Sequence, residues 1–271
     1  MATTNNIVDG FHQLGFRIDA NTIGALLKDA TKRRLSPVQT CEHIVAAERR
    51  ERDARNLKSR SRAAALGTFK PMDRFDWNWP RAIDRALYDQ LCTLDFIDQR
   101  QNLLLRGPSG VGKTSLAKNL GLAALDKGYT VRFTTLASAL ADLLKQESLP
   151  ALERRIKRYT APALWICDEI GYLPCDSRSA DLLYNIISRR HENAATIIST
   201  NIPFKKWNTI FPGAACVSAL VDRFVQHCHV MDIDADSWRE KEAREFADKK
   251  TAAKKRRTNS ATKRKPSRRP R

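Results

Sequence analysis

The sequence predicts an α/β fold in which a parallel five-stranded sheet is flanked by helices. Short apolar runs typical of buried strands alternate with longer segments of helical apolar spacing, and one run leads directly into a glycine-rich turn. Parallel strands need crossover connections, and the helices of these connections cover both faces of the sheet. The strand candidates are centred near Leu103, Val131, Trp165, Ile198 and Val230.

The charge divides the 271-residue chain, whose formal net charge is +18, into three regions. Residues 1–69 hold 12 Lys or Arg and 7 acidic residues, residues 70–248 hold 24 and 23, and residues 249–271 hold 12 and none. We therefore expect the α/β domain at 70–248, a small helical region at 1–69 and a separate basic tail at 249–271. Excess positive charge at both ends indicates a polyanionic partner.

Membrane and secreted classes of protein are disfavoured. The longest nearly unbroken apolar stretch, Ala163 to Cys167, is far shorter than the roughly 18–20 residues that cross a bilayer, and the first residues lack the pattern of a signal peptide. The six cysteines form no Cys-x-x-Cys and several lie in apolar runs, which is typical of free thiols in a reducing compartment. We expect a cytoplasmic protein without disulfides.

The tail at 249–271 has too few apolar side chains to fold, and its like charges repel one another. We expect a disordered polycation that binds DNA phosphates without sequence preference. Two other interpretations stay open, a solubilising tail without a partner and a nuclear localisation signal at 254–257 and 263–265.

In the N-terminal region, apolar residues from Ile23 to Ala30 recur at helical spacing, and Ser36-Pro37-Val38-Gln39 reads as a capped helix start. A long helix should follow. Its stripe of Val38, Cys41, Ile44 and Val45 is expected to pack, whereas the basic run from Arg49 to Arg62 is expected to lie on DNA phosphates or, alternatively, to be a solvated face.

Residues 107–114 have the pattern G-x-x-x-x-G-K-T directly after an apolar strand. Glycines let the backbone wrap a phosphate with its N–H groups pointing inward, at the positive start of a helix. Lys113 would reach the β- and γ-phosphates of ATP, and the Thr114 hydroxyl would hold Mg²⁺. The expected nucleotide contacts are Gly107, Pro108, Ser109, Gly110, Val111, Gly112, Lys113, Thr114 and Ser115.

Acidic and amide side chains follow two later apolar runs, those centred near Trp165 and Ile198. Asp168 and Glu169 come directly after the run that ends at Cys167, which is a Walker B arrangement. Asp168 is expected to hold the Mg²⁺, and Glu169 to polarise the attacking water as general base. Asn201 ends the run 196–200, where it could orient that water or simply make a turn.

Together these motifs resemble the IstB-type transposition helper ATPases, AAA+ proteins related to the DnaC-type helicase loaders. The resemblance runs from about Thr40 to Arg244 and is carried by Gly107–Thr114, Asp168–Pro174, Ser199–Asn201 and Leu220–Phe224. It implies that Asn201 is sensor I, that Arg239 is sensor II, and that Arg223 is an arginine finger for the ATP of a neighbouring subunit. Arg189 and Arg190 compete for the finger role. The chain departs from the family pattern at Cys167, where a branched aliphatic is usual, and in its longer basic tail.

The expected function is that of an ATP-dependent DNA-binding transposition helper. It would assemble as a homo-oligomer on double-stranded DNA, largely independently of sequence, regulate a partner transposase, and hydrolyse ATP at subunit interfaces. The main alternative is a DnaC-like replicative helicase loader. A small-molecule P-loop kinase and a DNA-bound nucleotide switch with little turnover are two others.

Three smaller groups of residues have two interpretations each. The first, His227-Cys228-His229 with Cys216, is read as a structural strand in preference to a zinc site, because its spacing matches no common zinc pattern. The second is Trp77 and Trp79, which we expect to pack near the adenine side of the core in preference to stacking on bases. The third follows Pro150 on an expected helix, and would face DNA or solvent: Arg154, Arg155, Lys157 and Arg158.

Overall fold

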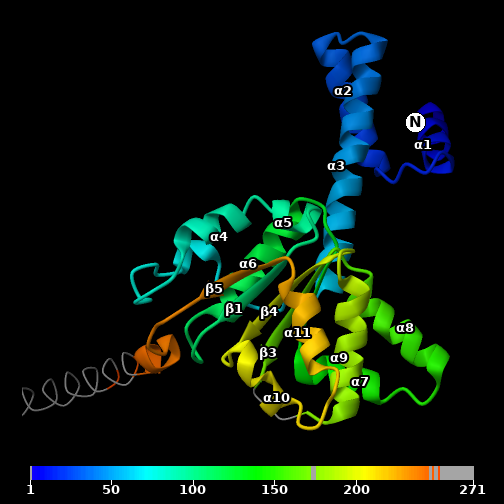
Figure 1. The fold of residues 1–271 in the computed structure, drawn as a ribbon. Coiled ribbons are helices and arrows are strands. Elements are labelled where there is room, and N and C mark those ends of the chain that lie inside the picture. Colours follow the sequence, from blue (N-terminus) through cyan, green and yellow to red (C-terminus); the bar gives the residue numbers. More distant parts are fainter. Residues whose placement is uncertain (1, 172–174, 244–245, 247–249, 251–271) are drawn as a thin grey trace, which may run out of the picture.

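The centre of the molecule is a five-stranded sheet, as predicted. The computed structural model describes residues 2–171, 175–243, 246 and 250. Its strands are β1 (Asn102–Arg106), β2 (Val131–Thr135), β3 (Leu164–Ile170), β4 (Ala195–Thr200) and β5 (Cys228–Asp232). They lie in the order β2-β3-β4-β1-β5 and every neighbouring pair is parallel (Figure 1). The carboxyl ends of β1, β3 and β4 therefore meet at one edge of the sheet.

Helices cover both faces of the sheet, which confirms the α/β class. One face carries α4 (Arg85–Leu91), α5 (Asp95–Asp98) and α6 (Lys113–Asp126), with the short η1 (Met72–Arg74) nearby. The other carries α7 (Leu136–Leu144), α8 (Leu149–Thr160), α9 (Ser177–Arg190), α10 (Trp207–Ile210) and α11 (Val217–Val225), with η2 (Phe204–Lys206). Side chains alternate along each strand, so Leu103 and Leu105 join the first core and Leu104 joins the second.

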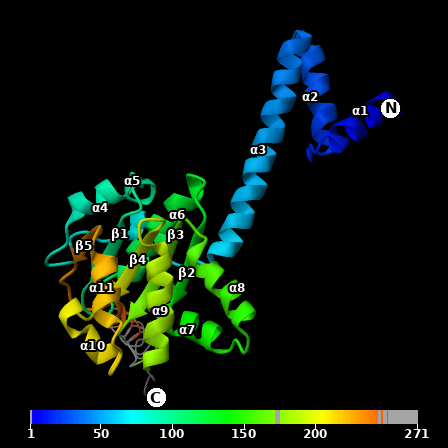
Figure 2. The ribbon, with the colours of Figure 1, turned by 45° about the vertical axis from the view of Figure 1, so that its right-hand side comes forward.

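The N-terminal region is a helical arm made of α1 (Ala2–Gln13), α2 (Ala20–Arg33) and α3 (Pro37–Ala64). Helix α3 projects from the α/β body and carries α1 and α2 at its far end (Figures 1 and 2). It begins as predicted, because the Ser36 hydroxyl accepts the Gln39 N–H and the Gln39 side chain accepts the Ser36 N–H. Its last turn is held on the body, where Arg132 Nη1 donates to the Ala63 carbonyl oxygen at 2.9 Å.

The expectation that one apolar stripe of α3 packs is wrong for most of its members. Ile44 is buried, but Val38 is 68% exposed, Val45 is 41% exposed and Cys41 is exposed. The residue that shares the buried face with Ile44 is Glu48, four positions later. Because a charged residue occupies this buried position, the spacing of apolar residues does not predict which face of α3 is covered.

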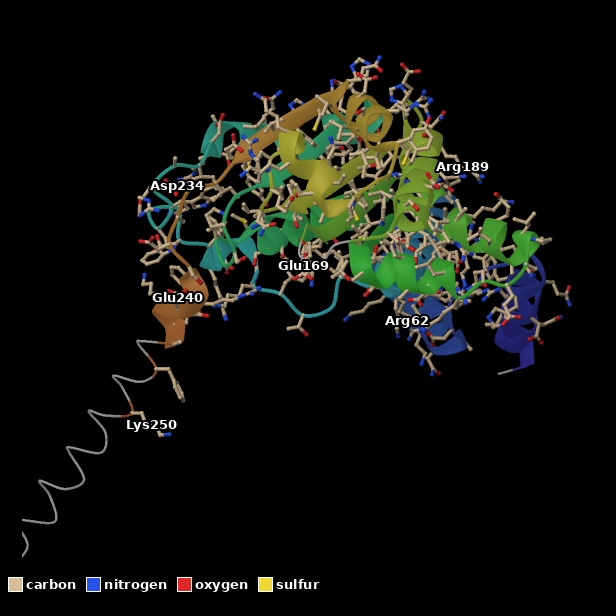
Figure 3. All side chains as sticks on the ribbon, turned by 60° about the horizontal axis from the view of Figure 1, so that its bottom comes forward. Arg62, Glu169, Arg189, Asp234, Glu240 and Lys250 are labelled. Atoms are coloured by element: carbon tan, nitrogen blue, oxygen red, sulfur yellow. The ribbon has the colours of Figure 1, made fainter. Side chains whose placement is uncertain are left out.

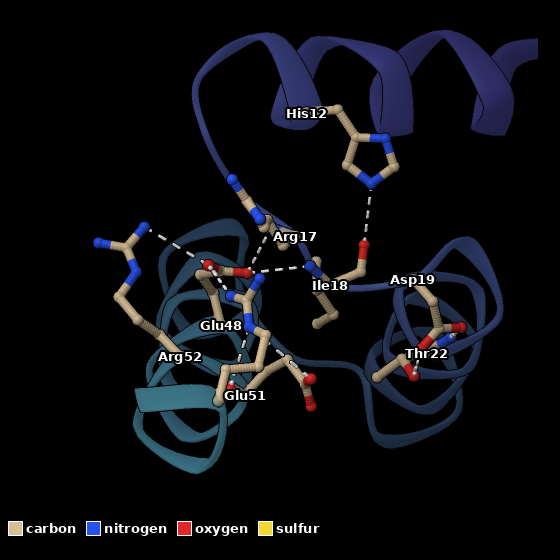
Figure 4. A network of polar contacts seen from close by, with 9 residues as sticks. His12, Arg17, Ile18, Asp19, Thr22, Glu48, Glu51 and Arg52 are labelled. Carbon is tan, nitrogen blue, oxygen red and sulfur yellow. Dashed lines mark hydrogen bonds and ion pairs between the residues drawn. The ribbon is translucent and has the colours of Figure 1, made fainter. Parts of the chain in front are cut away.

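The Glu48 carboxylate fastens the connection between α1 and α2 to α3 (Figure 4). It accepts the N–H groups of Arg17 at 2.8 Å and Ile18 at 2.9 Å, and it pairs with Arg52 at 3.4 Å and Arg55 at 3.3 Å. Burial by itself raises the pKa of Glu48, but these hydrogen bonds and charges outweigh burial, so its pKa lies below the ordinary value. The arm is thus held together by a buried charge in addition to a small apolar cluster around Val8, Ile18 and Ile23.

Two sequence expectations concern the ends of the chain. The predicted tail at 249–271 lies outside the described residues except for Lys250. The predicted division at residues 69 and 70 falls after α3, in a connection whose Leu66 is already buried in the core of the body.

Within the described ranges no helix has both the length and the apolar character needed to span a bilayer.

Candidate nucleotide-binding site

The turn Gly107–Thr114, called the P-loop below, joins β1 to α6 at the carboxyl edge of the sheet. Gly112, just before α6, has a φ of 100°, and a Cβ there would lie 2.8 Å from Phe75 Cε2. Only glycine adopts this conformation without strain and leaves room for the ring. No side chain caps the start of α6, so its first N–H groups are available to an anion.

Lys113 is the one charged residue of the P-loop, and it is buried. Its ammonium donates to the carbonyl oxygens of Gly107 at 2.7 Å and Pro108 at 2.6 Å. Its pKa is lowered to about 8, because burial and, to a smaller extent, the charge of Arg239 lower the pKa by more than Asp168 and Glu169 raise it. A dianionic ligand at this position would restore the full charge of the lysine.

The P-loop and β3 bring two oxygen ligands together. Thr114 Oγ1 donates to Asp168 Oδ2 at 2.8 Å, and the other carboxylate oxygen, Asp168 Oδ1, accepts the Ser199 hydroxyl of β4. A hydroxyl and a carboxylate are ligands of the kind that Mg²⁺ prefers. The donor set therefore fits the cation that the sequence predicts.

Glu169 occupies an irregular position at the end of β3. The pairing of β3 with β4 shifts register between Cys167 and Ile170, and Glu169 has a φ of 65°. This bulge leaves Glu169 exposed between two buried neighbours, Asp168 and Ile170. Figure 3 shows Glu169 with Asp234 and Glu240 of the C-terminal segment on one side, and with Arg62 and Arg189 on the other.

A cavity of about 310 Å³ joins these groups. Its floor is the P-loop from Gly110 to Ser115 together with Asp168, Glu169 and Ser199, and its walls come from segments far away in sequence. The walls include Lys70, Phe75, Trp79, Trp238, Arg239 and Glu242. The size and the lining suit a nucleotide whose phosphates lie on the P-loop.

One wall forms where the segment after β5 packs on the segment before α4. The backbone N–H of Trp238 donates to the Gly110 carbonyl oxygen at 3.1 Å. The Trp238 ring meets the Trp79 ring edge-on, with 5.4 Å between the ring centroids. Lys241 Nζ lies 4.2 Å and 4.3 Å from the two ring centroids, and Lys70 pairs with Glu242. These contacts place Arg239 in the same cavity as Lys113. Trp79 lines the cavity, and Trp77 packs on Phe75 and Tyr88 beside the core.

Asn201 lies directly after β4, beside the bulge but outside the cavity lining. Its Oδ1 would be 3.3 Å from a Cβ placed on Gly171. The preceding Thr200 is fully buried, and its hydroxyl donates to the Ile170 carbonyl oxygen at 2.7 Å. Asn201 is therefore held at the strand edge that also carries Asp168 and Glu169.

Arg223 lies on α11, and it too is outside the cavity lining. Its guanidinium donates to the Ser188 hydroxyl and lies 4.9 Å from the Tyr184 ring centroid, both on α9. It is half-buried.

The two arginines that compete for the finger role have other partners. Arg189 makes a bidentate pair with Glu153 at 2.7 and 2.8 Å. Arg190 is 1% exposed, and it donates to the Thr196 hydroxyl and to five carbonyl oxygens, those of Tyr159, Thr160, Pro162, Ala163 and Ala195. Burial lowers the pKa of Arg190 to about 9. Arg190 joins α9 to the strand ends and cannot reach a neighbouring subunit.

Comparison with known proteins places this site in a family. Residues 11–246 match the family of IstB-like ATP binding proteins. The chain belongs to this family. The IstB-like chain is 34% identical over 222 residues to the insertion sequence IS21 ATP-binding protein of Pseudomonas aeruginosa, spanning 82% of this chain and 84% of that one. It is 30% identical to the insertion sequence IS5376 ATP-binding protein of Geobacillus stearothermophilus, spanning 86% of this chain and 93% of that one.

Solved structures of other proteins share the fold of this IstB-like chain. The replication initiator DnaA bound to AMPPCP and single-stranded DNA is similar, with a TM-score of 0.51 and 17% identity, covering 64% of this chain and 52% of that one. DnaI is also similar, with a TM-score of 0.50 and 14% identity, covering 64% of this chain and 90% of that one. Both confirm the predicted P-loop AAA+ core, and at this identity they speak to the fold alone.

Sequence reasoning gave Ser199 no role of its own in the IstB-like site. This serine is 1% exposed, lines the cavity, and contacts both acidic residues of β3. Its position inside an apolar strand could have indicated a role, because a buried hydroxyl needs a hydrogen-bond partner. Only the register of β4 against β3 reveals what that partner is.

The remaining alternatives are also placed by the structure. His227 precedes β5, in which Cys228 and His229 lie: the Cys228 thiol is buried enough to raise its pKa to about 12, and His229 contacts Gln101 at 2.8 Å. Among the described residues no cluster of three or more His, Cys, Asp or Glu could hold a metal ion. On α8, Arg155 and Arg158 both pair with Asp142, at 3.5 and 3.4 Å. Two of the four members of that basic group therefore share one carboxylate within the chain.

Proposed function

We propose that this protein is an ATP-dependent, DNA-binding transposition helper that assembles on target DNA, regulates a partner transposase, and hydrolyses ATP between subunits. One observation carries the proposal: the Thr114 hydroxyl and the Asp168 carboxylate are 2.8 Å apart in a cavity that also contains Lys113, Glu169 and Arg239. An anion-binding turn, a cation-binding pair and a general base are the parts that phosphoryl transfer to water needs.

The nucleotide would bind with its phosphates on the Gly107–Ser115 backbone. Lys113 would leave the two carbonyl oxygens it now contacts and pair with the β- and γ-phosphates. Thr114 and Asp168 would hold Mg²⁺, which when bound supplies positive charge to the phosphate oxygens. Glu169 would accept a proton from the attacking water, Asn201 would orient that water, and Arg239 would contact the γ-phosphate from the cavity wall.

Arg223 would complete the site of a neighbouring subunit. Its position on α11, outside its own cavity, supports action in trans, and its pairing with neutral partners leaves its charge uncompensated. An arginine is always charged and offers a fixed fork to a developing phosphate charge. Hydrolysis would then depend on assembly, and assembly on DNA.

Subunit mixing tests this arrangement. Lys113→Ala and Arg223→Ala proteins are each expected to hydrolyse ATP poorly on duplex DNA. An equal mixture should recover activity at the roughly one quarter of head-to-tail interfaces that join an intact P-loop to an intact Arg223. Arg189→Ala, which removes a neighbouring arginine with its own partner, is the control and should leave activity intact. No recovery in the mixture contradicts the trans role.

The choice of partner rests on the relatives. Those at 30% identity and above are insertion sequence ATP-binding proteins, whereas the similarity to replication proteins is limited to the fold. The measurement is retention of a transposase or of a replicative helicase on the tagged protein with ATP and duplex DNA. Retention of the helicase in place of the transposase would contradict the transposition role.

A further inference from the structure

The hydroxyl of Ser199 connects the two acidic residues of the site. It donates to Asp168 Oδ1 and accepts the backbone N–H of Glu169 at 3.1 Å. A serine hydroxyl has one donor and two acceptor sites, so both bonds form together. Ser199 is itself buried in β4 at the floor of the cavity, and its side chain therefore has few alternatives.

The second of these bonds forms where the backbone is irregular. The pairing of β3 with β4 shifts register between Cys167 and Ile170, and Glu169, between them, adopts a left-handed φ of 65°. Such a conformation is unfavourable for a residue with a side chain and persists only where its surroundings fix it. The Ser199 hydroxyl is the side-chain group that receives the Glu169 N–H in this conformation.

We propose that Ser199 is a positioning residue that sets both carboxylates for ATP hydrolysis. Its bond to Asp168 Oδ1 leaves Oδ2 turned toward Thr114, which is the orientation that a cation shared by these two residues requires. Its bond to the Glu169 N–H holds the bulge that turns the Glu169 side chain out of the sheet. One hydroxyl thus links cation binding to placement of the general base. The inference rests on the proposed ATPase function.

The variant that tests it is Ser199→Ala, which removes the hydroxyl and adds no bulk. Its matched control is Thr134→Val, since Thr134 is a mostly buried hydroxyl on β2 whose partner is the Trp165 indole N–H at 3.2 Å. Both variants lose one buried hydroxyl, and only Ser199→Ala loses contact with the carboxylates. Three quantities are measured for each: melting temperature, kcat and KM for ATP on duplex DNA, and binding of a fluorescent ATP analogue at increasing Mg²⁺.

Ser199→Ala is expected to lower kcat by about 10–100-fold and to raise the Mg²⁺ concentration that half-saturates analogue binding by about 10-fold, as loss of an orienting partner does at metal sites. Analogue binding without Mg²⁺ should be unchanged, because the P-loop is intact. Thr134→Val should lower only the melting temperature.

A purely structural Ser199 gives a different result. The inference is overturned if Ser199→Ala behaves as Thr134→Val does, with a lower melting temperature but the kcat and Mg²⁺ requirement of the wild type. Failure of the proposed function is distinguishable, because the wild type would then not hydrolyse ATP, and Lys113→Ala would leave analogue binding intact.

Discussion

At the scale of single residues, Lys113 makes nucleotide binding depend on pH. Burial lowers the pKa of this lysine to about 8, and phosphates beside it would raise the pKa again. Below pH 8 the lysine is charged with or without ATP, so its protonation does not affect affinity. Above pH 8 binding must take up a proton, and the dissociation constant of ATP is expected to rise by up to about 10-fold per pH unit.

The measurement is calorimetric titration of ATP between pH 6.5 and 9.5 in buffers of different ionisation enthalpy, which also counts the protons taken up. The Lys113→Ala variant is the control, because any residual binding should lose this pH dependence. A wild-type affinity that stays constant to pH 9.5 would show that Lys113 is already fully charged in the free protein.

In the arm, Glu48 makes local stability depend on pH. Its carboxylate accepts the N–H groups of Arg17 and Ile18, and its replacement by Ala is expected to cost about 1–3 kcal/mol of arm stability, because both N–H groups lose their acceptor. The folded pKa lies below the ordinary value of 4.5, so the stabilisation is complete above that value and is lost as pH falls through the lower folded value.

Amide hydrogen exchange at Ile18 and tryptic cleavage after Arg17 report this local opening. Exchange and cleavage should both be faster in Glu48→Ala than in the wild type at pH 7. In the wild type they should become faster only at acidic pH. Glu51→Gln is the matched control, since Glu51 is half exposed and its carboxylate lies 3.9 Å from Arg55 without contact to the Arg17–Ile18 backbone. Unchanged exchange in Glu48→Ala would show that the apolar cluster alone holds the arm.

At the scale of elements, the segment after β5 is a wall of the nucleotide cavity. Trp238 is its central contact, with a backbone bond to Gly110 and a ring against Trp79. We expect Trp238→Ala to weaken ATP binding by about 3–10-fold, the equivalent of one aromatic pair, because Arg239 loses its support. The affinity for ATP is measured by the quenching of tryptophan fluorescence as ATP is added. Phe246→Ala is the control, because Phe246 is exposed in the same segment, and equal affinities for all three proteins would contradict a role for this wall.

The elements also show what sequence could and could not predict. Gly107–Thr114 and Asp168-Glu169 were predictable, because each is a local pattern next to an apolar strand, and parallel strands bring such ends to one edge. The contact of Trp79 with Trp238 was not, since it joins segments that only the completed sheet brings together. Glu48 and Ser199 were missed for a related reason. Each is a polar residue on a buried face, and its partners lie on another element.

At the scale of the whole molecule, positive charge is compensated in the body and less so at the ends. Many body arginines have acidic partners, as Arg106 has with Asp232 and Arg189 with Glu153. In α3, Arg52 and Arg55 pair with Glu48, whereas five other Lys and Arg side chains are in no ion pair within the part of the chain that the structure describes. One of the five, Arg60, donates to the Leu125 carbonyl oxygen on the body, and the other four are Arg49, Arg50, Lys58 and Arg62. These four and the 12 cations at 249–271 are the groups we expect to contact DNA phosphates.

Salt dependence separates the two groups of cations. Each phosphate contact contributes about −0.9 to the slope of log affinity against log salt concentration, so deletion of residues 249–271 should flatten that slope in proportion to the contacts it removes. Replacement of the four α3 cations by Ala should flatten it by at most about 3.6 for the same reason. Arg52→Ala is the control in α3, because its charge is already paired with Glu48 and its loss should change the slope little. The slopes are measured with duplexes of unrelated sequence, with and without ATP. A group of cations whose removal leaves the slope unaltered does not lie on DNA, and if both removals leave it unaltered, the contacts must come from the α/β body.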